Sequence, residues 1–319
     1  MKITAPVFSA IVMLTALAAG CGDDDPTSPE PTAFNFTFNG LPRLANGEYY
    51  EAWVSFPEEH RAGRALHGGD ERASLGTFTV TQSGAVEALT GGPASFSYAG
   101  EHDLGHAADV LISVETQGDT ARGPVLIAGE VAGDDAEGRT TLDIAHHDAV
   151  GADFDTASGT FILATPSDSV ATNETQGIWF TDPNGTTPTL TLPALGEGWI
   201  YHAHIFHGGH THSVGTFHAT NVEDSDGRGP EGGPNAGYNA PGSDFLTSAL
   251  DLADGQTTAF IVIQPAGDEH EGAARSLHDS SFPMRVLETT IAAGAPPHQS
   301  IALGPRVTPW PTASVNFAR

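Results

Sequence analysis

The chain has 319 residues, a formal net charge of −28, 38 glycines, 22 prolines and one cysteine. A surface this acidic repels nucleic acid and anionic lipid, and a single cysteine excludes disulfides and a cysteine-based zinc site within the chain. Glycine and proline at this level favour short strands joined by turns over long helices. The length is typical of two domains, so we expect an all-β protein built from two of them.

The N-terminal residues predict export and lipid attachment. Lys2 precedes an apolar run, Ala5–Leu17, which is too short to span a membrane as a stable helix. Leu17-Ala18-Ala19-Gly20-Cys21 resembles the bacterial lipobox, which implies that residues 1–20 are a lipoprotein signal peptide and that Cys21 carries the lipid. Residues 21–33 are acidic and proline-rich and predict a disordered tether. The residue after Cys21 is Gly22 and not the aspartate associated with inner-membrane retention, which favours the outer membrane or cell surface.

Two local patterns follow the tether. Phe34, Phe36 and Phe38 alternate with polar residues and predict a strand with three aromatic side chains on one face. Ser243–Leu252 is the best short helix candidate, although its apolar period is weak.

An internal repeat organises the rest of the chain. Three segments recur in the same order: Leu41–Val54 matches Leu192–Ile205, Ser74–Phe78 matches Ser213–Phe217, and Ile112–Asp119 matches Ile261–Asp268. A repeat this long indicates a duplicated domain rather than a solenoid. We expect two tandem Ig-like β-sandwiches, residues 34–145 and 156–319, with His146-His147-Asp148 in the linker between them. Each copy also has one long polar loop, Ser55–Ala73 or Asn221–Phe245, where binding residues commonly lie.

The repeated residues resemble the extracytoplasmic, C-terminal domain of anti-sigma-K factors (the RskA-like domain). The resemblance lies in Tyr50-Glu51-Ala52-Trp53-Val54 with Ser74-Leu75-Gly76-Thr77-Phe78, and covers most of residues 34–130 and 160–290. It implies an all-β sandwich that acts by binding rather than by catalysis. The sequence shows neither the sigma-binding domain nor the transmembrane helix of an anti-sigma factor, so no sigma factor is expected as a partner. Where the family has an acidic and an aromatic residue, the second copy has His202 and His204.

The stretch from Gly198 to His218 predicts a β-hairpin, because β-branched and aromatic runs flank Gly208-Gly209. Tyr201, Ala203 and Ile205 would form the core face, so we expect the alternate residues of that strand to point to solvent. The hairpin holds six of the chain's 15 histidines: His202, His204, His207, His210, His212 and His218.

The turn length decides which histidines meet. A three-residue turn would bring His212 onto the face of His202 and His204, whereas a two-residue turn would group His207, His210 and His212 near the tip. Either register collects three imidazoles, which are good ligands for Zn(II) and Cu(II). His218 is a further candidate ligand. The alternative is that all six are solvated surface residues.

Other candidate sites are weaker. Asp224 and Asp226 lie in an acidic turn that suggests calcium but lacks the full EF-hand pattern, so a plain acidic turn is the alternative. His102 and His106 are a second possible metal pair. No hydrolase, nucleotide-binding or zinc-protease motif occurs, so we expect no enzyme.

These observations predict an extracytoplasmic lipoprotein with a non-enzymatic binding or structural role at the cell envelope. Besides the membrane that holds the anchor, the expected partner is an envelope protein or a polysaccharide. The alternative is a protein that binds Zn(II) or Cu(II) through the His202–His218 hairpin, and a metal-dependent oxidoreductase is a weaker one. No cofactor is expected beyond such a metal ion.

Overall fold

The computed structural model describes residues 30–44, 47–57, 71–118, 122–134, 136–266 and 284–319. The predicted signal peptide, Cys21, most of the predicted tether and most of the polar loop Ser55–Ala73 lie outside these residues. The described residues form 19 strands, one short 3-10 turn at Leu104–His106 and no α-helix. None of their elements is a helix able to cross a membrane. The predicted all-β fold class is confirmed, with four antiparallel sheets distributed over two compact units.

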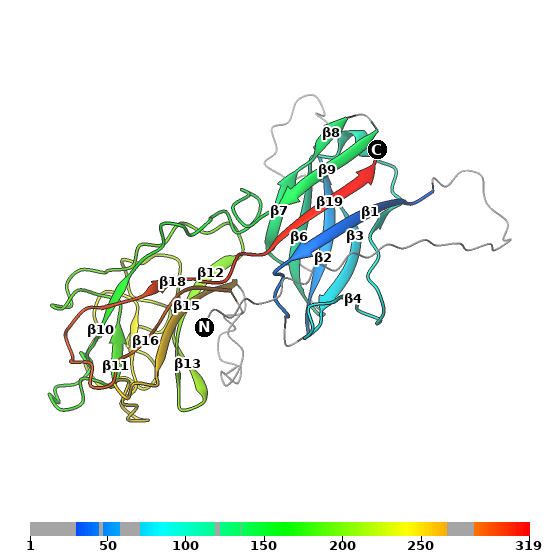
Figure 1. Cartoon of the computed structure of the whole chain (residues 1–319). Coiled ribbons are helices and arrows are strands. Elements are labelled where there is room, and N and C mark those ends of the chain that lie inside the picture. The colour runs from blue at the N-terminus through cyan, green and yellow to red at the C-terminus, as the bar shows by residue number, and fades with distance from the viewer. Residues whose placement is uncertain (1–29, 45–46, 58–70, 119–121, 135, 267–283) are drawn as a thin grey trace, which may run out of the picture. The chain divides into compact units, whose positions relative to one another are not determined.

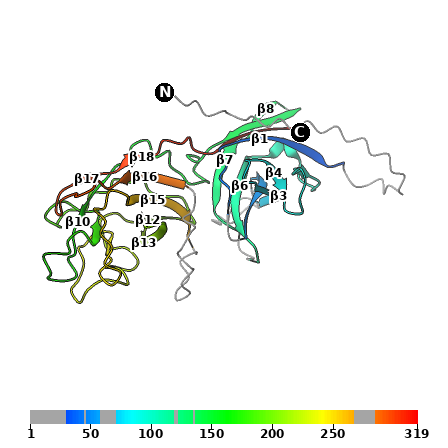
Figure 2. The same ribbon diagram turned by 60° about the horizontal axis from the view of Figure 1, so that its bottom comes forward.

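Unit 1 comprises Met1–Ala149 and Trp310–Arg319. Its sheets have the strand orders β5-β1-β19-β9-β8 and β4-β3-β2-β6-β7, and Figure 2 shows β1 and β8 in a layer apart from β3, β4 and β6. The strands are β1 (Thr32–Asn39), β2 (Glu48–Phe56), β3 (Glu71–Val80), β4 (Val86–Ala88), β5 (Ser97–Tyr98), β6 (Asp109–Thr116), β7 (Val125–Glu130), β8 (Ala132–Asp134), β9 (Glu137–Leu142) and β19 (Thr312–Ala318).

The predicted aromatic face of the first strand joins the two sheets of unit 1. The Phe34 ring stacks on Phe317 of β19, with 4.2 Å between ring centroids. The Phe38 ring stacks on Phe78 of the other sheet, with centroids 5.0 Å apart. Aromatic side chains bury large apolar areas, so this row is a principal contact between the layers.

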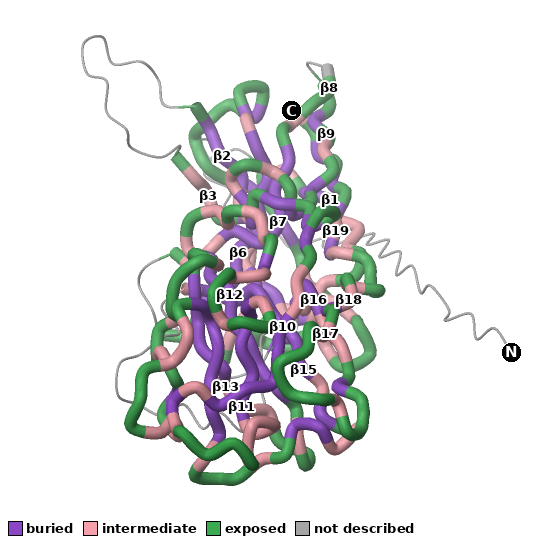
Figure 3. The backbone as a smooth tube through the Cα atoms, turned by 90° about the vertical axis from the view of Figure 1, so that its left-hand side faces the viewer, coloured by how far each residue is buried: buried purple, intermediate pink, exposed green. Residues whose placement is uncertain are grey.

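Unit 2 comprises Val150–Pro309. Its sheets have the orders β14-β11-β10-β17 and β13-β12-β15-β16-β18. Figure 3 shows buried residues concentrated on strands such as β12 and β13, with exposed residues in the connecting loops. The strands are β10 (Thr160–Leu163), β11 (Gly177–Trp179), β12 (Trp199–His207), β13 (His210–Phe217), β14 (Gly242–Asp244), β15 (Thr258–Pro265), β16 (Met284–Thr290), β17 (Ile301–Ala302) and β18 (Gly304–Pro305).

The domain boundaries differ from the expected tandem arrangement at the C-terminus. The second domain is expected to extend to residue 319, but β19 pairs with β1 and β9 inside unit 1 (Figure 1). Ala313, Val315 and Phe317 are buried there while the alternate residues are exposed. Unit 2 is therefore inserted between β9 and β19 of unit 1, and the expected domain 156–319 is not one contiguous unit.

One hairpin of unit 1, β2–β3, and one hairpin of unit 2, β12–β13, have the same geometry. The register of β2 on β3 shifts directly after Ala52, and that of β12 on β13 directly after Ala203. The residues that pair with these alanines are Gly76 and Gly215, and both have a positive φ. A bulge at the same position bends both hairpins in the same way.

A tyrosine anchors each of these hairpins in the same manner. The Tyr50 hydroxyl donates a hydrogen bond to the carbonyl of Pro42 at 2.7 Å, and the Tyr201 hydroxyl donates to the carbonyl of Pro193 at 2.7 Å. A duplication would leave such correspondences, and the duplication itself stays a prediction.

The helix predicted over Ser243–Leu252 is wrong. Its first residues belong to β14, because the fully buried Asp244 carboxylate accepts hydrogen bonds from the Trp179 indole N–H at 2.8 Å and the Ser167 backbone N–H at 3.0 Å. A buried carboxylate needs such donors, and they hold this segment extended beside β11. Burial raises the pKa of Asp244, and its hydrogen bonds to Ser167 and Trp179 oppose that shift.

Candidate functional site

The histidine-rich hairpin has the two-residue turn. His207 pairs with His210 across Gly208 and Gly209, which have φ of 58° and 88°. Positive φ at both central positions is the backbone of a type I′ turn, which explains the glycine pair. This register puts His202 and His204 on one face of β12 and the histidines near the tip on the other. His218 is exposed beyond the end of β13.

The expectation that His202 and His204 point to solvent is wrong. Their exposed fractions are 8% and 4%. The centroid of the His204 ring lies 3.8 Å from that of the His202 ring and 5.2 Å from that of the Phe260 ring. Arg285 lies 4.0 Å from the Phe260 ring centroid. Side chains of β15 and β16 therefore pack beside this pair and take the place of solvent.

The two buried imidazoles differ in their hydrogen bonds. His202 Nδ1 lies 2.9 Å from Gln264 Oε1 and its Nε2 lies 2.7 Å from Ser213 Oγ. Because an amide oxygen only accepts, Nδ1 donates and Nε2 accepts, which is the neutral form of the ring. Neither ring nitrogen of His204 makes a hydrogen bond of ordinary geometry.

Burial disfavours the charged form of both rings. It lowers the pKa of His202 to about 4, although the bond to Gln264 opposes the shift. Burial also lowers the pKa of His204 well below its usual value, and repulsion from His202 adds to this; the backbone of His212 acts weakly in the opposite sense. Both rings are therefore neutral at neutral pH, the form in which imidazole binds metals.

The histidines near the tip do not converge. His207 Nδ1 lies 2.8 Å from the Thr257 hydroxyl and 3.7 Å from an Asp254 carboxylate oxygen. The His212 ring lies edge-on to Phe245, and His210 is exposed. Among the described residues, no three hairpin side chains bring ligand atoms within 4.8 Å of one another. The structure brings together a buried pair, His202 and His204, rather than a set of three.

Asp224 and Asp226 lie together beside the bulge of β13. Asp224 accepts hydrogen bonds from the Gly242 backbone N–H at 2.7 Å and from the Asp226 backbone N–H at 3.2 Å. Burial raises the pKa of Asp224, and the charge of Asp226 raises it further. Two coupled carboxylates are brought together, but no third histidine or carboxylate of the described chain completes a metal-ligand set there.

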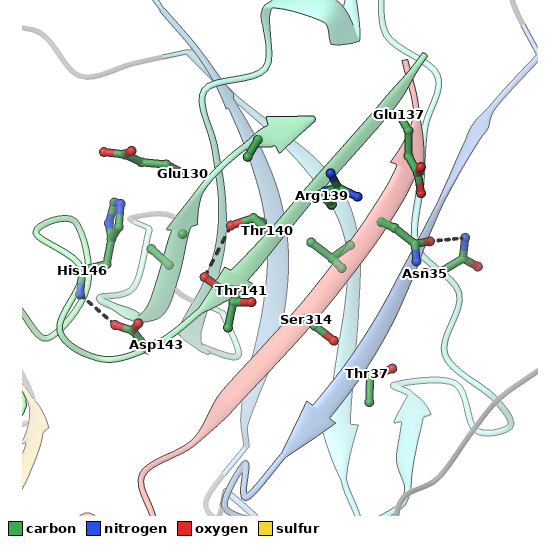
Figure 4. A pocket seen from close by; sticks show the side chains of 15 residues that line it. Asn35, Thr37, Glu130, Glu137, Arg139, Thr140, Thr141, Asp143, His146 and Ser314 are labelled. Carbon is green, nitrogen blue, oxygen red and sulfur yellow. Dashed lines mark hydrogen bonds between the residues drawn. The ribbon is translucent and has the colours of Figure 1, made fainter. Parts of the chain in front are cut away.

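Sequence reasoning missed a polar pocket in unit 1. It has a volume of about 760 Å³, and Figure 4 shows labelled side chains from β1, β9 and β19 along it, with Glu130 and His146 to one side. Two cross-strand rows line it: Asn35, Asn316 and Arg139, and then Thr37, Ser314 and Thr141.

The chemistry of this pocket is polar and of mixed charge. The Asn35 amide donates to the Asn316 amide oxygen at 3.2 Å. Glu137 and Asp143 add carboxylates to the lining, and Arg139 adds a guanidinium. The signal was present in the sequence, because Asn35 and Thr37 alternate with the aromatic residues of β1, and Ser314 and Asn316 alternate with the buried residues of β19. Only the pairing of β1 with β19 brings the rows together.

The expected linker His146-His147-Asp148 belongs to unit 1 and is the one group of the described residues in which three ligand-type side chains approach within 4.8 Å. His102 and His106, the other predicted pair, contact acidic residues instead: His102 lies 3.1 Å from Glu71 and His106 lies 4.0 Å from Asp103.

No protein-family model, curated protein or solved structure matches this chain. The resemblance to the RskA-like domain therefore stays a prediction from the motif residues.

Proposed function

We propose that this protein is a lipid-anchored, non-enzymatic binding protein of the cell envelope whose ligand is a polysaccharide chain. The observation that carries the proposal is the polar pocket of unit 1. Its volume of about 760 Å³ falls within the range of roughly 300–1,000 Å³ typical of ligand sites. The anchor follows from the lipobox-like residues before Cys21, and the outer membrane or cell surface is the proposed location.

The lining of the pocket favours a polysaccharide over a protein partner. Protein interfaces have an apolar, aromatic-rich centre, whereas the rows here present amides, hydroxyls and one guanidinium. Asn35, Asn316, Ser314 and Arg139 are all exposed on this sheet face. Amide and hydroxyl groups donate and accept hydrogen bonds, so they match the hydroxyl groups of a sugar chain.

A co-sedimentation assay with insoluble envelope polysaccharide tests the proposed ligand. We expect the full chain to bind, and Asn316→Ala/Arg139→Ala to lose most of the bound fraction, because each removed group costs about 1–3 kcal/mol when its partner is left unpaired. The matched control is Asn221→Ala/Arg228→Ala, which removes the same exposed side-chain types from unit 2. Equal binding by both double variants would contradict the polysaccharide site.

Metabolic labelling with an alkyne fatty acid tests the anchor. We expect label on the wild-type chain and partition into the detergent phase, because several acyl chains give stable membrane attachment. Cys21→Ala removes the only thiol of the chain and should abolish both. Label that persists on Cys21→Ala would show that the anchor lies elsewhere.

A Zn(II)- or Cu(II)-binding role of the hairpin is the second candidate. The unpartnered ring nitrogens of the buried His204 favour it, because buried polar atoms normally have a partner. His202 is less suited to a metal, since both of its ring nitrogens already have hydrogen-bond partners.

A further inference from the structure

The turn that follows β9 gathers three consecutive metal-ligating side chains. Ala149 N–H donates to the His146 carbonyl at 2.9 Å, which closes a tight turn over His147 and Asp148. One ligand atom from each of His146, His147 and Asp148 lies within 4.8 Å of the other two. The His146 and His147 rings lie 4.4 Å apart, and His147 Nε2 lies 3.7 Å from an Asp148 oxygen.

His146 is held in place from both sides. Its backbone N–H donates to the Asp143 carboxylate at 3.2 Å, as does that of Ala145 at 2.9 Å. Its side chain is 12% exposed, and Nε2 faces an Asp109 oxygen at 3.6 Å, beyond hydrogen-bond distance. Asp109 is itself buried and accepts a hydrogen bond from the Ser55 hydroxyl at 3.1 Å.

The two nitrogens of His146 have different surroundings. Because Nε2 faces Asp109 inside the unit, Nδ1 is the nitrogen turned toward the turn, where it accepts a hydrogen bond from the Asp148 backbone N–H at 3.3 Å. A metal ion bound at Nδ1 would replace this long hydrogen bond. A carboxylate behind a histidine orients the ring and makes it a more basic ligand, an arrangement common around protein-bound zinc. The buried Nε2, which makes no hydrogen bond, is the atom that Asp109 would engage.

We propose that His146, His147 and Asp148 bind one divalent transition-metal ion, with Asp109 as a positioning residue behind His146. Two imidazoles and one carboxylate suit Zn(II) or Cu(II) better than Ca(II) or Mg(II), which prefer oxygen ligands. Ligand atoms around such an ion are about 3–3.5 Å apart, so side-chain rotations in the turn close the set. The site is distinct from the hairpin, and metal binding there does not require the polysaccharide.

His147 and Asp148 leave room for further ligands on the ion. The His147 side chain is 74% exposed and the Asp148 side chain 26% exposed. Three protein ligands with open positions are typical of sites at which a metal also binds water or another molecule. Since His146 lines the polar pocket, the ion would lie at one end of it (Figure 4).

Metal titration of the full chain in detergent tests the site. The protein carries a tag without histidine, is stripped with chelator, and is titrated with Zn(II) against a chromophoric competitor and with Cu(II) under electron paramagnetic resonance. We expect His146→Ala/His147→Ala to lose one equivalent of Zn(II) and the Cu(II) signal with nitrogen hyperfine structure. His102→Ala/His106→Ala, which removes two histidines from elsewhere in unit 1, should keep both.

Two further variants separate binding from folding. His147→Ala alters an exposed side chain and should weaken Zn(II) binding by about tenfold or more, with unchanged circular dichroism. Asp109→Asn should weaken it by about 10–100-fold and keep the nitrogen hyperfine pattern. Unchanged Zn(II) binding in His147→Ala would overturn the proposal. Loss of Zn(II) binding in His202→Ala/His204→Ala would also overturn it, and would place the metal in the hairpin.

Discussion

His204 and Trp53 occupy equivalent positions of the repeat, and their side chains have different surroundings. In unit 1 the matching residue is Trp53, whose indole N–H donates to the Ser113 hydroxyl at 2.8 Å. In unit 2 the imidazole of His204 is buried with both nitrogens unpartnered, beside the equally buried His202. A buried polar group without a partner costs free energy, so unit 2 holds destabilising groups in its histidine pair.

The buried histidines make the stability of unit 2 depend on pH. Folding lowers the pKa of His202 from 6.5 to about 4. Below pH 6.5 the unfolded chain therefore binds a proton that the folded unit does not, so stability present above this pH is lost as the pH falls toward 4. The loss from His202 alone is about 3 kcal/mol.

Urea unfolding at several pH values measures this loss. His202→Gln keeps a polar side chain but does not titrate, so we expect a smaller drop in free energy of unfolding between pH 7 and 4.5 than for the wild type. Asp224 changes the stability of unit 2 with pH in the opposite direction. Its pKa is raised in the folded unit, so the stability that it contributes is lost as the pH rises from 3.8. Each variant is therefore compared with the wild type at the same pH. A control, His102→Gln, should follow the wild type, and equal slopes for all three would refute the assignment.

At the scale of elements, β19 pairs with strands that are far from it in the sequence. It pairs with β1 over Phe34–Asn39 and with β9 over Glu137–Leu142, so it is the middle strand of its sheet. Both neighbours would become edge strands without it, with open rows of backbone donors and acceptors.

Deletion of residues 310–319 should therefore unfold unit 1 and leave unit 2 folded. Val150–Pro309 contains both complete sheets of unit 2, and none of its described strands pairs with β19. Hydrogen exchange resolved by peptide would show lost protection in β2 and β6 and retained protection in β12 and β15. Val315→Pro, which removes one donor from the ladder, should give the same pattern in weaker form. Loss of protection in both units together would contradict their independence.

For the whole molecule, the sequence predicts the features that neighbouring residues determine, such as turns and the faces of strands. The glycine pair Gly208-Gly209 predicts a turn but leaves two registers open, and the aromatic face of β1 follows from alternation alone. The burial of His204 could not be predicted, because Phe260 and Arg285 lie far along the chain on other strands. The polar pocket was missed for the same reason, since Asn35 and Asn316 are 281 residues apart. His146 was assigned to a linker because nothing in its neighbours indicates Asp109.

The nested order of the units also determines when each can fold during synthesis. Unit 2 is complete once Pro309 has emerged, whereas β1 must wait for β19, which leaves the ribosome after all of unit 2. The domain that begins first therefore finishes last, because its sheet closes over a sequence separation of 281 residues. Until then β1 and β9 present unpaired edges, and these are the strands most exposed to mispairing and in need of chaperone protection.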